Sequence, residues 1–270
     1  MNADLQRRSN AALMQAAIKA APRGSVYEFG YTARWKSNLM RGLPFDEIEC
    51  DFTEGATREL PKKLAGAHSS VAIVVNTFGP WRGDPTKLAV LGATRFYDAR
   101  FDIARKTPLG GTPPRLHFVA EGNIVVAVES NCTEWMKPSP AEFSPSYSTV
   151  DSTERDKPWF DEMHHLHDTP DTYKFLDAAV LVKHAFGLLH SYPGQVVRLL
   201  YLFWEPLNAG SWPQCRAHRA EADALAERVQ KSSVRLIPMP YRDLWAEWKR
   251  KTSSAHLKYL RARYNVEVRR

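Results

Sequence analysis

A single acidic residue closes a segment that is otherwise apolar, and this residue, Glu129, is the first candidate for chemistry in the sequence. The segment Ile124–Glu129 has the composition of a strand that is buried on both faces. Side chains alternate across a strand, so Glu129 and Asn131 should point to one face and Ser130 to the other. A carboxylate in such surroundings costs free energy unless it is paired or bound to a metal ion. Glu129 is therefore either a ligand or the point at which the strand leaves the core for solvent.

The segments around Glu129 predict a mixed β-sheet flanked by helices. Five segments have the β-branched or alternating character of strands: Arg95–Ala104, Arg115–Ala120, Ile124–Glu129, Val196–Trp204 and Val234–Pro238. Between the third and the fourth of them, Tyr173–His190 is apolar almost all round, as expected of a long helix packed on the sheet. This helix should be the crossover that joins two parallel strands. The expected fold class is therefore α/β.

Helices, loops and one open alternative account for the remaining segments. His68–Phe78 fits a strand by its β-branched residues and a helix by a serine cap, and periodicity does not separate the two. The polar stretch Lys137–Pro170 is expected to be a loop. Further helices are expected at Leu5–Ala20, at Lys87–Ala93, within Pro213–Lys231 and at Tyr241–Tyr259.

Length and composition fit one domain of 270 residues, with a helical N-terminal part (1–65), a core (66–240) and a basic C-terminal helix (241–270). The N-terminus carries charged residues where a signal peptide needs an apolar run, and no stretch approaches the roughly 18 apolar residues that span a bilayer. The three cysteines are odd in number and widely spaced, which favours reduced thiols. These features predict a cytoplasmic protein.

The net charge of +7 is concentrated at the C-terminal end, where residues 242–270 contain nine basic and three acidic side chains. A basic surface of this kind suits the phosphate backbone of DNA, because binding releases condensed counterions. The alternative is an ordinary solvated helix. The candidate DNA-binding residues are Lys249, Arg250, Lys251, Lys258, Arg261 and Arg263.

The phrase GGTPPRLHFVA…NIVVAVESNCTEW, together with the order of elements, resembles the PD-(D/E)xK superfamily of restriction-endonuclease-like nucleases. It is most similar to a bacterial group of restriction endonucleases, and the stretches AHSSVAIVVNTFGPW, YKFLDAAVLVKHAFGLL, LLYLFWEP, HRAE and YRDLWAEW extend the resemblance from about Phe45 to Trp248. The resemblance implies a nuclease core in which an Asp and a Glu-x-Lys hold Mg²⁺ or Mn²⁺ and hydrolyse a DNA phosphodiester. Residues shared with the group outside this motif include Glu205, His218 and Glu221.

Two positions depart from the motif that the resemblance implies. Glu129 matches the glutamate, but Asn131 stands in place of the lysine and His117 in place of the aspartate. Asparagine can hydrogen-bond a water but carries no charge, and a neutral imidazole is a poor ligand for Mg²⁺. Substitutes for the lysine are Lys183 and Lys106, and substitutes for the carboxylate are Asp102 and Glu59. The expected catalytic residues are thus Glu129, Asn131, His117 and Lys183, and the expected metal ligands are Glu129, His117 and Asp102.

Three hypotheses about function follow. The first is a metal-dependent DNA endonuclease of restriction type, for which the class implies a homodimer when both strands are cut. The second is a nuclease fold that has lost catalysis and serves as a DNA-binding or assembly module. The third is an unrelated α/β enzyme that uses the histidine-rich segment Asp161–Asp168, which the sequence places in a loop.

Overall fold

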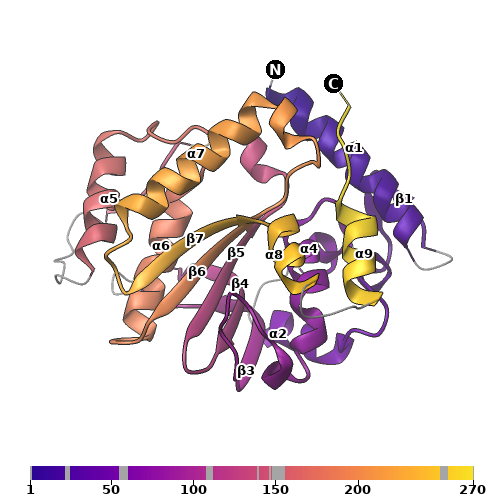
Figure 1. Cartoon of the computed structure of the whole chain (residues 1–270), viewed down its shortest axis with the longest axis horizontal. Coiled ribbons are helices and arrows are strands. Elements are labelled where there is room, and N and C mark those ends of the chain that lie inside the picture. The colour runs from indigo at the N-terminus through magenta and orange to yellow at the C-terminus, as the bar shows by residue number, and fades with distance from the viewer. Residues whose placement is uncertain are drawn as a thin grey trace.

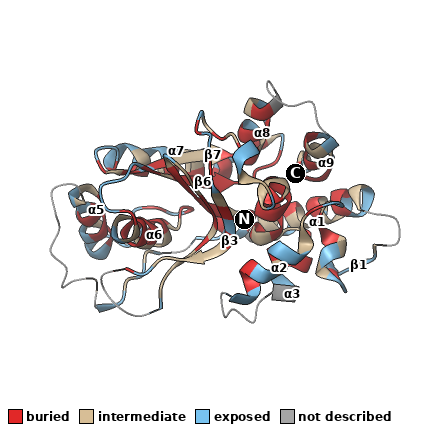
Figure 2. Ribbon diagram, turned by 90° about the horizontal axis from the view of Figure 1, so that it is seen from below, coloured by how far each residue is buried: buried red, intermediate tan, exposed pale blue. Residues whose placement is uncertain are grey.

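A computed structural model of the chain describes residues 2–21, 25–54, 60–107, 112–138, 140–145, 147, 156–249 and 255–269. One central β-sheet separates two layers of helices (Figure 1). Helices α5, α6 and α7 cover one face of the sheet, and α2, α4 and α8 lie on the other side, with α1 and α9 outside them. Buried residues occupy the sheet and the helix faces directed at it (Figure 2). The predicted α/β class is confirmed.

The sheet has five strands in the order β3-β4-β5-β6-β7. Its members are β3 (Asp98–Ala104), β4 (Arg115–Glu121), β5 (Val125–Asn131), β6 (Val197–Phe203) and β7 (Val234–Pro240). Strands β3, β4 and β5 pair antiparallel, whereas β5, β6 and β7 pair parallel. All five predicted strands are present, and the sheet is mixed as expected.

Helix α6 (Ala178–Ser191) is the crossover between the parallel strands β5 and β6, as predicted. It begins five residues later than the apolar pattern suggested, with Asp177 as its N-cap. The preceding segment is kept out of the helix because the Glu221 carboxylate, on α7 (Pro213–Arg228), accepts the backbone N–H groups of Lys174, Phe175 and Leu176. Glu221 therefore has a structural role.

Helix α5 (Lys157–Asp168) occupies part of the stretch expected to be a loop, so that prediction was wrong there. The helix buries Trp159, Phe160, Met163 and Leu166 on one face, and the ring of Phe160 stacks on Phe186 of α6 at 4.5 Å. Histidines and acids between these apolar residues concealed the helical period in the sequence. The histidines of this segment thus lie on the polar side of a packed helix.

On the opposite face of the sheet, the ambiguous segment is helix α4 (Ser70–Phe78). The Ser69 hydroxyl accepts the N–H groups of Val71 and Ala72, so the serine cap decides between helix and strand. Phe78 then stacks on Phe118 of β4 with 4.5 Å between ring centroids. The other helices on this side are α1 (Asn2–Ala20), α2 (Phe45–Glu54), α3 (Leu60–Ala65), α8 (Tyr241–Lys249) and α9 (Ala255–Tyr264).

Two further helix predictions need correction. The expected helix at 87–93 is a 3-10 turn (Pro85–Lys87) followed by a bridge between Val90 and Ala93. The expected terminal helix is two helices, α8 and α9, and the first of them carries the buried Trp245 and Trp248. Minor elements are the strands β1 (Tyr27–Glu28) and β2 (Tyr31–Thr32) and the 3-10 turns Trp35–Asn38, Gly79–Trp81, Glu134–Met136 and Ala209–Ser211.

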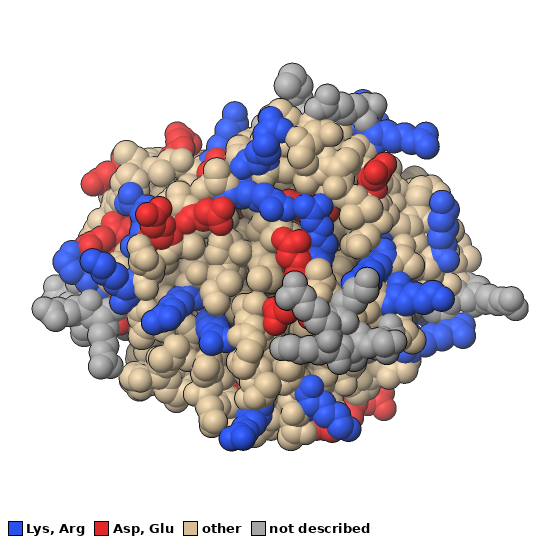
Figure 3. All heavy atoms as spheres, in the orientation of Figure 1, with Lys and Arg blue, Asp and Glu red and all other residues tan. Residues whose placement is uncertain are grey.

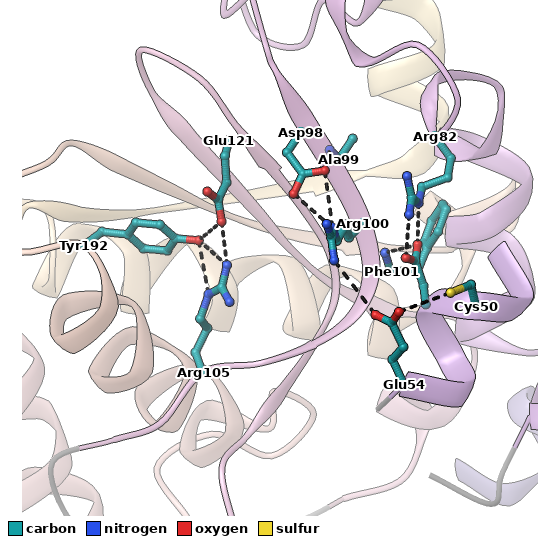
Figure 4. Close-up of polar contacts among 11 residues, drawn as sticks. Cys50, Glu54, Arg82, Asp98, Ala99, Arg100, Phe101, Arg105, Glu121 and Tyr192 are labelled. Carbon is teal, nitrogen blue, oxygen red and sulfur yellow. Dashed lines mark hydrogen bonds and ion pairs between the residues drawn. The ribbon is translucent and has the colours of Figure 1, made fainter. Parts of the chain in front are cut away.

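The edge strand β3 is fixed to its surroundings by ion pairs and hydrogen bonds (Figure 4). The buried Asp51 carboxylate of α2 pairs with Arg82 at 2.6 Å and accepts the backbone N–H of Phe101 at 3.0 Å. Directly after the last residue of β3, Arg105 pairs with Glu121 of β4 at 2.6 Å, and both side chains contact the Tyr192 hydroxyl. These contacts tie the edge of the sheet to helices on both of its faces.

Cys50, Cys132 and Cys215 are free thiols, in agreement with the sequence. Among the described residues, no helix combines the length and apolar character that a membrane span requires.

Candidate functional site

The site is built around Glu129, near the end of β5. The pairing of Phe118 with Val128 puts the next residues, His117 and Glu129, opposite one another on the antiparallel strands β4 and β5. The Oε2 atom of Glu129 lies 3.1 Å from Nδ1 of His117 and 2.9 Å from Nε2 of His184, which comes from α6. Only 12 % of the Glu129 side chain and 3 % of the His184 side chain are exposed, compared with 21 % for His117. Two imidazoles thus contact the same carboxylate oxygen in a largely buried site.

The electrostatics of this cluster favour an ionised carboxylate beside a protonated imidazole. Burial by itself would raise the pKa of the Glu129 carboxyl, but the charges and hydrogen bonds of the two imidazoles outweigh it and lower the pKa to about 2. Burial by itself would lower the pKa of His117, but the charge of Glu129 raises it above its ordinary value. The backbone N–H of Ser130 also lies 3.2 Å from Nδ1 of His117, a contact that only a deprotonated nitrogen accepts. The raised pKa favours the proton on Nδ1, donated to Glu129.

The neighbours of Glu129 on β5 have structural roles. The Ser130 hydroxyl donates to the carbonyl oxygen of Ser70 at 2.8 Å and accepts from the Tyr241 hydroxyl at 2.7 Å, so it faces the layer that contains α4 and α8. The predicted alternation of Glu129 and Ser130 is therefore observed. The Asn131 Oδ1 atom accepts the backbone N–H of Trp135 at 3.2 Å and fixes the turn after the strand. Asn131 thus caps a turn at the position where the resemblance led us to expect a lysine.

Two of the suggested substitutes, Asp102 and Lys183, are engaged away from Glu129. Asp102 forms an ion pair with Arg115 at 2.7 Å, and its carboxylate is committed to that partner. The Lys183 ammonium donates to the backbone oxygen of Glu142 at 2.7 Å, beside the ring of Phe143. Glu59 lies outside the described residues. Of the expected site residues, His117 and Glu129 meet, whereas Asp102 and Lys183 are engaged elsewhere.

His184 is the site residue that the sequence did not reveal. It is separated from Glu129 by 55 residues and stands in an apolar helix, where a histidine is ordinarily part of the core. The available signal was its helix, which was expected to pack on the sheet. The contact between His184 and Glu129 becomes visible only when the position of α6 over the sheet is known.

These residues do not fit a magnesium ion. Mg²⁺ takes oxygen ligands in octahedral geometry, and among the described residues Glu129 is the carboxylate that both imidazoles contact, while Asp177 interacts with it only through its charge and caps α6. In the described part of the chain, no group of three or more His, Cys, Asp or Glu side chains has the arrangement to hold a metal ion. The histidine-rich segment on α5 falls under the same finding, and its Glu162 is buried against Arg228 and Tyr173. Of the expected metal ligands, His117 and Glu129 bind one another.

A cavity of about 350 Å³ opens beside His117 and gives this imidazole access to solvent. His68, Lys62, Lys63 and Glu134 also line it. An imidazole that is hydrogen-bonded to a carboxylate can exchange a proton on its other nitrogen, and the two exposed lysines outnumber the one acid, Glu134, that lines the cavity. The sequence analysis did not single out these lysines.

The basic C-terminal residues differ in their surroundings. Lys258 is exposed and Arg261 is half-buried on α9. Arg263 is completely buried, hydrogen-bonded to Asn38 and Tyr27, so its expected role as a DNA contact is corrected to a structural one. Arg250, Lys251 and the side chain of Lys249 lie outside what the structure describes.

Comparison with known proteins agrees with the resemblance seen in the sequence. The model of a family described as "restriction endonuclease associating with ARP" matches residues 6–265. No curated protein and no solved structure matches the chain. Because the matched region covers most of the chain, the expected restriction-endonuclease-like family is confirmed. The chain belongs to the family of restriction endonucleases associating with ARP.

Proposed function

We propose that this chain is a DNA-binding protein in which the nuclease fold is retained and magnesium-dependent hydrolysis through Glu129 is lost. The observation that carries the proposal is the shared hydrogen bonding of Glu129 Oε2 to His117 and His184. Family membership supports DNA as the ligand. Of the hypotheses drawn from the sequence, this geometry favours the nuclease fold without metal catalysis over the active endonuclease.

The cost of recruiting a metal ion supports this choice. To bind Mg²⁺ through Oε2, Glu129 would have to release hydrogen bonds of 2.9 and 3.1 Å that are formed in a buried site, and binding through Oε1 would still place the ion beside the His117 imidazole. Breaking a buried charged pair costs about 3–5 kcal/mol, because one partner is left without compensation. A protonated His117 would also repel the dication. One carboxylate with two imidazole partners is therefore a poor starting point for a magnesium site.

Positive charge near the cluster supports the DNA-binding part of the proposal. The chain has a net charge of +7, and Lys62 and Lys63 line the cavity beside His117. Lysines that neutralise DNA phosphates release the counterions condensed on the DNA, and this contribution to binding does not depend on the base sequence. We therefore expect DNA binding that weakens steeply as the salt concentration rises.

One experiment separates DNA binding from cleavage. Purified protein is incubated with supercoiled plasmid in Mg²⁺ and, separately, in Mn²⁺, and binding of a labelled duplex is measured by fluorescence anisotropy over a range of salt. The proposal predicts salt-sensitive binding and no nicking or linearisation in either metal. Cleavage that disappears in Glu129→Ala would refute the loss of hydrolysis, and an absence of binding would refute the assignment to DNA.

A restored variant serves as the matched control. His117→Asp together with Asn131→Lys supplies the two residue types that the family motif implies and removes one imidazole from Glu129. Appearance of Mg²⁺-dependent cleavage in this variant alone would support the view that these two positions abolish activity. Equal cleavage by the natural chain and the variant would contradict it.

A further inference from the structure

A second cluster of charge lies away from Glu129, where helices α7 and α8 begin. A cavity of about 250 Å³ is lined there by Arg216, Arg219, Arg242, Ala209, Gly210 and Cys215, and these residues define the arginine pocket. No acidic residue lines the pocket in the described part of the chain. On the face seen in Figure 3, basic side chains gather in a band over the region between α7 and α8, with acidic ones beside them. The pocket therefore presents three guanidinium groups to solvent.

Two of the three guanidinium groups are held in place by one buried carboxylate. Glu205, whose side chain is only 1 % exposed, pairs with Arg219 and, at 2.8 Å, with Arg242. Arg216 donates to the carbonyl oxygen of Gly210 and does not contact Glu205. Asp243 lies 3.7 Å from Arg242 and is half exposed, so three positive charges face two negative ones in the surroundings. Glu205 acts as a positioning residue that fixes two of the three guanidinium groups.

The position of the pocket in the fold favours an anion. Glu205 follows the end of β6 and Arg242 follows the end of β7, and Phe203 of β6 is in register with Asn131 of β5 and Pro240 of β7. The pocket thus lies at the carboxyl edge of the parallel strands, where open α/β sheets commonly bind ligands. Arg216 is in the first turn of α7 and Arg242 in that of α8, and helix N-termini carry partial positive charge.

We infer that the arginine pocket binds a phosphate group, either of a DNA backbone or of a free phosphate ester. Guanidinium forks match phosphate oxygens with two parallel hydrogen bonds, which a lysine cannot do. Each guanidinium carries five N–H donors. Arg216 uses donors on Gly210, Arg219 on Glu205, and Arg242 on Glu205 and on the carbonyl oxygens of Pro206 and Leu207, so each guanidinium keeps at least one donor for a ligand. The inference that the pocket binds a DNA phosphate rests on the proposed DNA binding, whereas the inference that it binds a free phosphate ester does not.

Arg216 is the residue to change, because it is exposed and makes no ion pair with Glu205. Inorganic phosphate is titrated into the full chain, and the backbone amide signals of Cys215, Arg216 and Arg242 are followed by ¹⁵N NMR. Saturable shifts are expected in the natural protein and a strong loss of affinity in Arg216→Ala, with Arg216→Lys intermediate. Arg235→Ala, an exposed arginine of β7 outside the pocket, should behave like the natural protein. Absence of saturable shifts, or equal shifts in Arg216→Ala, would overturn the inference.

Binding of a DNA phosphate by the pocket is tested with the same variants and a labelled duplex. Loss of one phosphate contact should weaken binding uniformly across sequences and reduce the slope of log affinity against log salt by about 1. If phosphate binds but Arg216→Ala leaves the DNA slope unchanged, the pocket takes a free phosphate and not the backbone. If phosphate binds and the natural protein binds no DNA, the proposed function fails while the arginine pocket stands as a phosphate site.

Discussion

Replacing Glu129 by glutamine removes the charge that both imidazoles share while keeping the shape of the side chain. The pKa of the carboxyl is about 2 in the folded protein against 4.5 for an ordinary glutamate. At about 1.4 kcal/mol per pH unit, this difference corresponds to about 3 kcal/mol of folding free energy. The side chain is only 12 % exposed, so screening by solvent reduces this value little.

The sign of the pH dependence follows from the direction of each pKa change. The folded pKa of Glu129 lies below the unfolded value, so its contribution is present above about pH 4.5 and is lost as the pH falls toward 2. The pKa of His117 is raised, so the contribution of that imidazole is present below its unfolded pKa and is lost as the pH rises through the folded pKa. The natural protein should therefore exceed Glu129→Gln in stability most strongly between about pH 5 and 6.5.

Urea unfolding at pH 2.5, 4, 6 and 8.5 measures this difference, with Glu227→Gln as a control at an exposed glutamate of α7. At pH 6 the free energy of unfolding of Glu129→Gln should lie about 3 kcal/mol below that of the natural protein, and this difference should disappear toward pH 2.5. In the same variant, NMR titration should show the pKa of His117 falling below its ordinary value, because burial then acts without the carboxylate. A gap that does not change with pH, or an unchanged pKa of His117, would refute the shared-carboxylate geometry.

Three predictions concern the framework around the site. Asp51→Ala should cost about 3 kcal/mol or more in unfolding free energy, because Arg82 and the N–H of Phe101 lose their buried acceptor; an unchanged urea midpoint would contradict this. Gly187→Ala should lower the melting temperature, since a Cβ there would lie 2.7 Å from the Arg105 carbonyl oxygen, and a calorimetric scan checks it. Glu162→Gln should destabilise the packing of α5 and speed proteolysis there, because its buried carboxylate pairs with an arginine; equal cleavage rates would argue against that role.

Sequence patterns predicted the parts of the fold that depend on one segment at a time. The β-branched segments and the apolar crossover helix show their character locally, and the structure has them as expected. The helix at 157–168 was missed because its apolar stripe is interrupted by histidines and acids, and only packing against Phe186 reveals it. In the same way, α6 begins late because Glu221, from a distant helix, holds the preceding backbone.

The candidate site could be predicted only in part, for a related reason. The pairing of His117 with Glu129 follows from a two-strand register, which the short turn between the strands allows one to foresee. The contact of His184 with the same oxygen depends on how a helix is seated over the sheet, and no spacing in the sequence encodes it. Likewise, Asn131 reads as a defective catalytic residue in the sequence, whereas the structure shows it capping the turn at Trp135.

The central claim is that Glu129 is bound by two imidazoles and is not a metal ligand, and a paramagnetic titration tests it most directly. Mn²⁺ is added up to one equivalent while the ring signals of His117 and His184 are followed by NMR, with the exposed His190 of α6 as the internal reference. We predict no broadening of the two site histidines beyond that of the reference. Selective broadening of His117 and His184, lost in Glu129→Gln, would place a metal ion at the carboxylate and contradict the account.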